Sequence, residues 1–275
     1  MRTYQFVVSK YFSEKVKLGE VLQKATSLQF EVLADAASKG AVWHQKNGKG
    51  KILKIRSLHI QLNPEDKITF YYDSKILSFP ELKTAMCLHE TVHYGVWLKE
   101  AGVVPQGTQT ADHTSLLRYV EKMKKKDVYL IHRLDRETEG LMILGYTSEA
   151  AGKLGDLFQK NMIHKTYEAI VKGELERGLK QTINDSLDGK EAITHFEVLG
   201  NKNGHSLLTL KIETGRLHQI RRHLESYGHP VMGDPKYGKG NKNRAGLQLL
   251  AKSLNFIDPW TRLPVTVTCE RSLTL

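Results

Sequence analysis

The sequence predicts an α+β protein, with a large mixed sheet in its longer C-terminal part and a small α/β module at the N-terminus. Strand signals outnumber helix signals after the first third of the chain. Tyr167, Ala169 and Val171, for example, alternate with more polar neighbours, as in a half-buried strand. A chain of 275 residues that is 40% hydrophobic can bury one full core and a smaller one.

Charge and cysteine content restrict the classes of function. The chain has 41 Lys and Arg residues against 30 Asp and Glu, a net charge of +11. We therefore expect a polyanionic partner, with RNA or DNA favoured over an anionic membrane surface, although a merely soluble basic protein stays possible. Two cysteines form no disulfide framework, and neither a signal peptide nor a membrane span is evident. A cytoplasmic location fits.

The N-terminal module is expected between residues 18 and 73. Apolar spacing predicts two short helices, over about 21–25 and 30–37, and Gly40 ends the second. A strand at 41–43 then leads into an Asn-Gly turn, and a turn at 62–66 precedes a strand at 68–72.

Two helices followed by a basic hairpin resemble the alpha-L RNA-binding module of ribosomal proteins. We assign residues 1–81 to this module and a linker, and 82–275 to a second, catalytic domain. The basic side chains of the hairpin bind phosphates or form a solvated face: Lys46, Lys49, Lys51, Lys54 and Arg56.

In the second domain the apolar run 141–144 predicts a buried strand. Ser148 is expected to cap a helix that extends to about Lys160. Strands are expected near 166–171 and 208–212, and a helix from about 217 to 227 ends at Gly228.

The most informative segment is 131–140, which sets Asp135 between Arg133 and Arg136 and ends at Gly140. Nearby positive charge keeps a carboxylate ionised. Taken alone, this pattern fits a reactive site or a structural ion pair equally well.

Four blocks of sequence, in the same order, resemble the RluA-type RNA pseudouridine synthases. They are His132–Gly140, like H-R-L-D-x-x-T-S-G; Lys165–Val171, like K-x-Y-x-A-x-V; Thr214–Leu224, like T-G-R-x-H-Q-I-R-x-H-L; and Gly228–Gly238, like G-x-P-I-x-G-D-x-x-Y-G. Four ordered blocks over about two thirds of the chain are far more specific than one motif.

The resemblance implies the pseudouridine synthase fold, a mostly antiparallel sheet with flanking helices and a central cleft. It implies that Asp135 is the nucleophile, that Arg221 pairs with it, and that Tyr167 stacks on the uracil and assists proton removal. Arg133 would enter the RNA helix as the target base leaves it. The residues expected to bind substrate are Arg133, Arg136, Thr138, Arg216, His218, Gln219 and Leu249.

The implied reaction converts uridine to pseudouridine in structured RNA. It has no redox step, so we expect neither a cofactor nor a metal. Asp135 could attack the sugar or the base, or assist a glycal-type intermediate. We favour ribosomal over transfer RNA and expect a monomer with no membrane partner.

Three positions depart from the family pattern. Glu139 replaces the serine of T-S-G, Glu100 replaces the proline of N-K-P-x-G-L, and Leu250 replaces the histidine of L-L-H-A. These changes leave open an alternative: a catalytically weakened RNA-binding or RNA-chaperone protein on the same fold.

The stretch 89–93 reads His-Glu-Thr-Val-His and matches the zinc-hydrolase pattern H-E-x-x-H. That pattern requires a helix, so that both histidines share one face. A glycine and strand-forming residues follow at once, so we expect a strand or hairpin here and disfavour a zinc enzyme.

Overall fold

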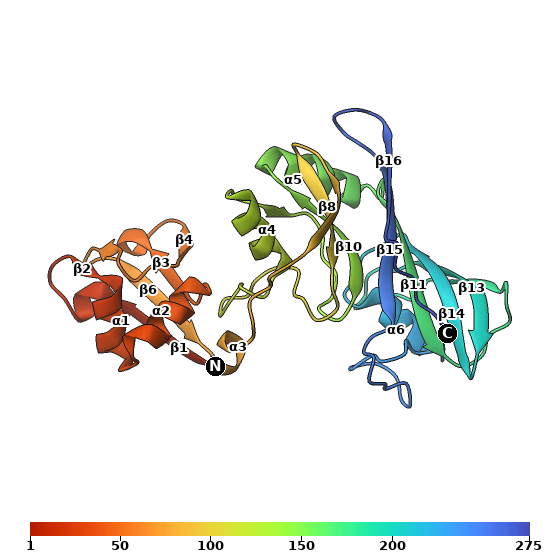
Figure 1. Ribbon diagram of the computed structural model, residues 1–275, viewed down its shortest axis with the longest axis horizontal. Coiled ribbons are helices and arrows are strands. Elements are labelled where there is room, and N and C mark those ends of the chain that lie inside the picture. Colours follow the sequence, from red (N-terminus) through yellow and green to blue (C-terminus); the bar gives the residue numbers. More distant parts are fainter. The chain divides into compact units, whose positions relative to one another are not determined.

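The computed structural model describes residues 1–275 and divides the chain into two compact units (Figure 1). One unit comprises Met1–Lys83 with Gln106–Tyr119, and the other comprises Thr84–Pro105 with Val120–Leu275. None of the helices is both long enough and apolar enough to cross a membrane.

The first unit packs two helices, α1 (Leu18–Thr26) and α2 (Phe30–Ser38), with a four-stranded antiparallel sheet in the order β1-β6-β3-β4. Its strands are β1 (Arg2–Val7), β3 (Val42–Gln45), β4 (Ile52–Ile55) and β6 (Lys67–Tyr72), with a second pair, β2 (Val16–Lys17) and β5 (Gln61–Leu62), and a short helix α3 (Ser74–Leu77). The two predicted helices and the Asn-Gly turn are confirmed. Gly40 and Asn47 both have positive φ, which suits these residue types.

The segment Gln106–Tyr119 packs with the first unit, whereas the sequence placed it in the second domain. Asp112 explains the difference: its carboxylate accepts hydrogen bonds from both Arg56 Nη atoms, at 3.0 and 2.6 Å, and from Lys54 Nζ at 2.9 Å. Lys54 and Arg56 therefore hold this segment. Within the expected basic hairpin, Lys46, Lys49 and Lys51 stay exposed.

The second unit is built on a ten-stranded sheet in the order β12-β13-β14-β11-β15-β10-β8-β7, with β16 paired to β15 and β9 to β10. Its strands are β7 (Met86–Glu90), β8 (Tyr94–Lys99), β9 (Tyr129–Leu130), β10 (Glu139–Gly145), β11 (His164–Lys172), β12 (Lys180–Ile183), β13 (Thr194–Lys202), β14 (His205–Ile212), β15 (Leu249–Ile257) and β16 (Pro264–Thr268). Only β10 and β15 pair in parallel. The predicted mixed, mostly antiparallel sheet is confirmed.

Gly140 allows the parallel contact between β10 and β15. A Cβ atom at this position would lie 2.4 Å from the carbonyl oxygen of Ala251, and φ is +128°. Only glycine fits so close an approach of two backbones.

Helix α4 (Leu116–Lys124) contains Val120, the residue at which the second unit resumes, and two further helices lie wholly in that unit: α5 (Ser148–Gln159) and α6 (Gln219–Ser226). The cap of α5 is Thr147 and not Ser148, because Thr147 Oγ1 accepts a hydrogen bond from the Ala150 N–H. Helix α6 begins two residues later than expected.

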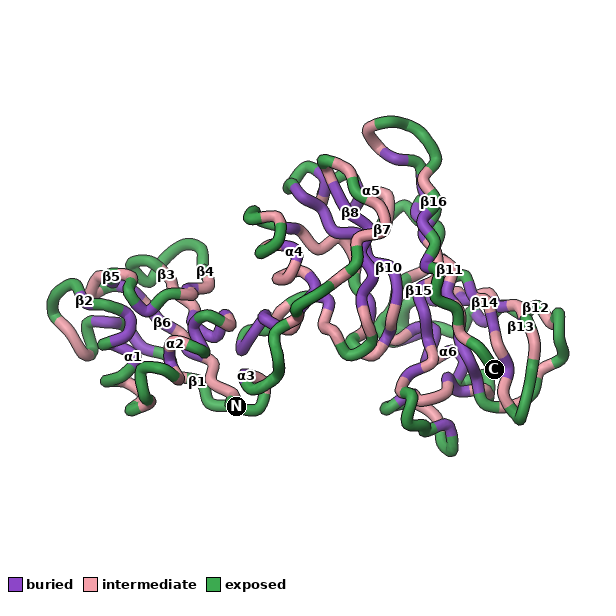
Figure 2. The backbone as a smooth tube through the Cα atoms, in the orientation of Figure 1, coloured by how far each residue is buried: buried purple, intermediate pink, exposed green.

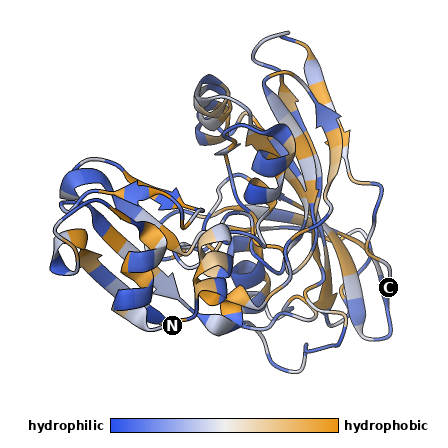
Figure 3. Ribbon diagram, turned by 60° about the vertical axis from the view of Figure 1, so that its left-hand side comes forward, coloured by the Kyte–Doolittle hydropathy of each residue, from blue (hydrophilic) through white to orange (hydrophobic).

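Burial follows the strands of the second unit, whose buried stretches are purple in Figure 2. Hydrophilic and hydrophobic bands alternate along its long strands (Figure 3). Because successive side chains of a strand point to opposite faces, neighbouring residues serve different surfaces. Tyr167 faces a pocket, for instance, while Glu168 binds the backbone of Leu273.

Candidate active site

The loop between β9 and β10 presents Asp135. His132 fixes the start of this loop to β10, because its Nε2 accepts a hydrogen bond from the Ile143 N–H at 2.9 Å. Burial, helped by the charge of Lys165, lowers the pKa of His132 to about 3, so the ring is neutral. The loop closes on itself where the Thr138 N–H donates to the Asp135 carbonyl oxygen. A neutral anchor and a closed turn hold the carboxylate in place.

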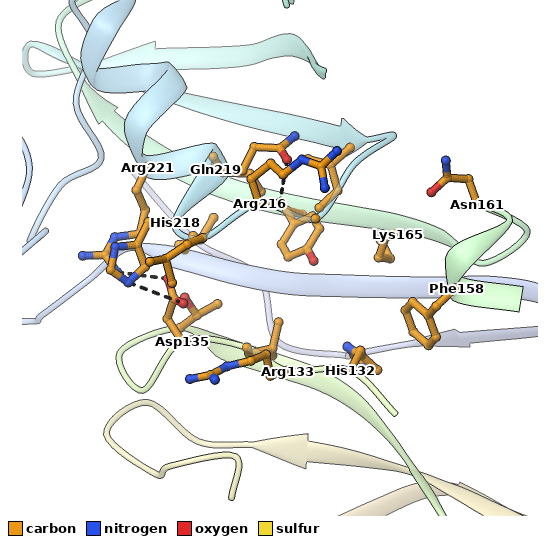
Figure 4. A pocket seen from close by; sticks show the side chains of 18 of the residues that line it. His132, Arg133, Asp135, Phe158, Asn161, Lys165, Arg216, His218, Gln219 and Arg221 are labelled. Atoms are coloured by element: carbon orange, nitrogen blue, oxygen red, sulfur yellow. Dashed lines mark hydrogen bonds and ion pairs between the residues drawn. The ribbon is translucent and has the colours of Figure 1, made fainter. Parts of the chain in front are cut away.

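The Asp135 carboxylate contacts Arg221 and His218 (Figure 4). Arg221 Nη1 donates to Asp135 Oδ2 at 3.0 Å, and His218 Nε2 lies 3.7 Å from Oδ1. The Asp135 side chain is 20% exposed, whereas that of Arg221 is 2% exposed. Asp135 thus reaches solvent while its cation comes from inside the protein. Arg133 and Arg136, its neighbours in sequence, are exposed.

Asp234 holds Arg221 from the opposite side. Arg221 Nε and Nη2 donate to its two carboxylate oxygens at 2.7 and 2.8 Å, in the bidentate geometry that lysine cannot make. Burial opposes the charge of Arg221, but its hydrogen bonds to Asp234 and Asp135 raise its pKa. Asp234 is fully buried, and the backbone N–H groups of Lys236 and Tyr237 also donate to it. Arg221 is therefore permanently charged and fixed in direction.

Asp234 was not among the residues predicted for the site, although it lies in one of the four family-like blocks. The signal was the Gly-Asp pair at 233–234. Its partner could not be read from the sequence, because Arg221 lies on α6, thirteen positions away.

His218 stands at the start of α6 with a left-handed backbone, φ 54°. Its Nδ1 and the Tyr237 hydroxyl are 2.9 Å apart, which orients the ring toward Asp135. Burial lowers the pKa of His218 although Asp135 opposes the shift, so this ring is neutral near pH 7. A neutral imidazole beside a carboxylate can accept or pass on a proton.

Tyr167 lies on β11 and is 8% exposed. Burial, together with the charge of Asp135, raises its pKa, so the side chain is a phenol and not a phenolate. It can donate a hydrogen bond or present its ring for stacking. Leu249 on β15 is buried and lines the same pocket.

These groups open into one pocket of about 490 Å³, within the range of small-molecule sites. Asp135, His218 and Arg221 lie at one end, and Phe158, Asn161 and Lys165 at the other (Figure 4). The expected site residues that line it are Asp135, Tyr167, Arg221, Arg133, Thr138, Arg216, His218, Gln219 and Leu249. Arg136 is not in the lining; its Nε donates to the Gly102 carbonyl.

Gln219 braces the pocket wall. Its amide nitrogen donates to Ile193 O and Thr194 Oγ1, and its oxygen accepts from Thr214 Oγ1 and from the Arg216 N–H. All these bonds are internal, and Gln219 is 3% exposed. It shapes the pocket through its neighbours.

Lys99, which the sequence did not single out, is fully buried beside the Asp135 loop. Its Nζ donates to the carbonyls of Glu100, Val103 and Arg136 at 2.9 to 3.1 Å. Burial lowers its pKa to about 8, although nearby carboxylates oppose the shift. Lys99 ties the turn after β8 to the loop that carries Asp135.

The His-Glu-Thr-Val-His stretch forms the hairpin between β7 and β8, as expected, and not a helix. His93 stacks on Trp260, with ring centroids 4.1 Å apart. Nowhere in the chain do three or more His, Cys, Asp or Glu side chains form a group that could hold a metal ion.

Comparisons with known proteins identify the family to which this fold and this pocket belong. A sequence profile described as RNA pseudouridylate synthase matches residues 93–226. Ribosomal large subunit pseudouridine synthase D of Buchnera aphidicola is 33% identical over 193 residues, covering 63% of this chain and 61% of that protein. tRNA pseudouridine synthase C of Haemophilus ducreyi is 32% identical over 173 residues, which cover 51% of this chain and 71% of that protein.

Among solved structures, human RNA Pseudouridylate Synthase Domain Containing 1 has the same fold, with a TM-score of 0.58 at 21% identity, covering 68% of this chain and 84% of that one. The chain belongs to the RNA pseudouridylate synthase family. It spans about three fifths of the length of the Buchnera relative.

Proposed function

We propose that this protein converts uridine to pseudouridine in RNA, with Asp135 as the nucleophile. The observation that carries the proposal is the Asp135 carboxylate, which reaches the pocket and is aligned by a buried arginine. A partly exposed anion with a fixed counter-charge can stay ionised and aimed at a substrate.

The reaction is an isomerisation in which atoms balance without a co-reactant. The bond from uracil N1 to the sugar C1′ breaks, and a bond from uracil C5 to C1′ forms. The proton on C5 is lost, and N1 gains one. Asp135 would assist the first step by attacking the sugar or the base, or by promoting a glycal-type intermediate.

Arg221 would act on Asp135 and not on the substrate. Its three hydrogen bonds to Asp135 and Asp234 fix the carboxylate and leave little freedom for it to turn away. Such positioning contributes to catalysis because misplacement by about 1 Å can cost about 100-fold in rate.

Proton transfer from C5 requires a base near the uracil. Tyr167 is a neutral phenol, so as a base it would have to pass its own proton on as it takes one. We propose that its ring stacks on the uracil and that its hydroxyl relays the proton. His218, neutral and 3.7 Å from Asp135, is a second candidate for the relay.

The target uridine must leave its helix to reach Asp135. Arg133 is exposed at the pocket, where it could fill the space that the base leaves. Arg216 and Thr138 also line the pocket and would contact the flipped nucleotide.

We propose ribosomal RNA as the substrate ahead of transfer RNA, because the Buchnera relative is named for the large ribosomal subunit. The Haemophilus relative, named for tRNA, supplies the alternative. The first unit, which resembles an alpha-L module, would hold RNA through its exposed lysines. We further propose a monomer that acts in the cytoplasm, where its two free cysteines would stay reduced.

The test is to incubate purified protein with ribosomal RNA and, separately, with transfer RNA from cells that lack it, and to map pseudouridines at nucleotide resolution. We expect new pseudouridine at one or a few sites of ribosomal RNA. Modification of transfer RNA alone would correct the substrate. RNA binding with no pseudouridine in either pool would favour the non-catalytic alternative.

A further inference from the structure

The segment Cys269–Leu275, which follows β16, crosses β15 and β11 (Figure 1); we call it the strap. The Cys269 N–H donates to the Lys252 carbonyl at 2.9 Å, and Lys252 Nζ donates to Ser272 Oγ at 2.6 Å. The Leu273 N–H donates to Glu168 Oε2 at 2.9 Å. The strap is therefore tied to both strands by its backbone as well as its side chains.

The strap lies behind the strands that form the pocket. Three residues of these strands line the pocket: Thr138, which directly precedes β10, Tyr167 of β11, and Leu249 of β15. The residue that follows each one faces the other way and meets the strap or its apolar cluster: Glu139, Glu168 and Leu250. A change in the strap can thus shift these three strands without touching the pocket itself.

Arg271 makes ion pairs from the strap to two glutamates. Its Nη1 and Nη2 donate to the two carboxylate oxygens of Glu100, at 2.6 and 2.8 Å, and Nη1 also donates to Glu139. The hydrogen bond to Glu100, and to a smaller extent the one to Glu139, raises the pKa of Arg271. Since one nitrogen serves both carboxylates, Glu100 and Glu139 lie side by side and would repel each other without Arg271.

All three departures from the family pattern meet at this surface. Glu100 and Glu139 bind Arg271, and Leu250 belongs to the apolar cluster on which Leu273 packs. The departures, which left a weakened enzyme open as an alternative, therefore all lie at the strap or at the apolar cluster on which it packs.

We propose that the strap positions the active-site loop, with Arg271 joining the turn after β8 to the start of β10. Glu139 is four residues after Asp135, and Lys99, next to Glu100, binds the Arg136 carbonyl. Arg271 thereby fixes two places: Glu139, where the Asp135 loop ends, and the turn after β8, from which Lys99 supports the loop. This inference rests on the proposed function and makes Arg271 a positioning residue that does not touch substrate.

The first test compares Arg271→Ala with the wild type in single-turnover assays at saturating RNA. We expect the rate to fall on the order of tenfold, within the range that small misplacements produce, while RNA affinity changes less than about twofold, since one distant surface charge adds little. The matched control is Arg177→Ala, which removes the same charge from an exposed loop and should keep the wild-type rate.

The second test restores the family residues. In a Glu100→Pro, Glu139→Ser background the carboxylate pair is absent, so adding Arg271→Ala should change the rate less than about twofold, as expected for sites whose coupling has been removed. An equal loss in both backgrounds, or a wild-type rate for Arg271→Ala alone, would overturn the proposal. If Arg271→Ala does not fold, Arg271→Lys carries the test, because it keeps the charge and loses the fork.

The control for the proposed function is separate. If the wild-type protein forms no pseudouridine in any RNA, the function fails. If the wild type is active and Arg271 variants match it, only the strap proposal fails.

Discussion

Replacing Arg221 with lysine tests whether the buried arginine aligns Asp135. The guanidinium spans two carboxylates with three hydrogen bonds of 2.7 to 3.0 Å. A lysine keeps the charge but has one nitrogen, which cannot reproduce the fork to Asp234 while reaching Asp135. At least one charge-assisted hydrogen bond disappears, at a cost of about 1.5 to 3 kcal/mol.

We expect Arg221→Lys to lower the free energy of unfolding by about that amount, and to lower the single-turnover rate about 100-fold or more if Asp135 moves by about 1 Å. The assay pairs urea unfolding with rates measured where the variant is folded.

Arg222→Lys is the matched control on the same helix. Arg222 also forms a bidentate pair, with Asp188, but that carboxylate is 69% exposed. Exposed pairs contribute at most about 1 kcal/mol, so this variant should keep its stability and rate. Arg221→Lys with a rate within about threefold of wild type would refute the positioning role.

Three further predictions follow from the site and the first unit. Tyr167→Phe keeps the ring and removes the hydroxyl, so the single-turnover rate should fall about 100-fold with RNA affinity unchanged; normal turnover would exclude a proton relay. In the folded protein His132 is neutral, because its pKa is lowered from 6.5 to about 3. Its contribution to the stability of the fold is therefore complete above pH 6.5 and is lost as the pH falls toward 3. In that window the unfolding free energy should drop about 1.4 kcal/mol per pH unit from this group, and His132→Gln should flatten the slope in acid unfolding curves. Replacing Lys46, Lys49 and Lys51 with alanine should lower the slope of log affinity against log salt by about 0.7 to 0.9 for each RNA phosphate that these lysines neutralise, and an unchanged slope would show that this hairpin does not touch RNA.

Much of the fold could be predicted because the signals are local. Alternating apolar residues identified β11 and β14, and the run 141–144 identified β10. The Asn-Gly pair at 47–48 predicted a turn for the same reason, since both residues accept positive φ.

Interactions between distant segments could not be predicted. Asp112 pairs with Arg56 across 56 positions, and Arg271 pairs with Glu100 across 171, and no local pattern records either. Asp234 was missed because the Gly-Asp pair at 233–234 does not reveal its partner Arg221, which lies thirteen positions earlier on α6. The family resemblance supplied the link between Asp135 and Arg221, 86 positions apart, which spacing alone could not give.

The central claim is that the Asp135 carboxylate performs the chemistry. Asp135→Asn keeps the size of the side chain and still accepts a hydrogen bond from Arg221, but it has no anionic nucleophile. The measurement is pseudouridine formed in single turnover on the RNA that the wild type modifies, with RNA affinity and folding checked on the same sample. The account predicts no detectable pseudouridine with nearly unchanged affinity, and a rate near that of the wild type would contradict it.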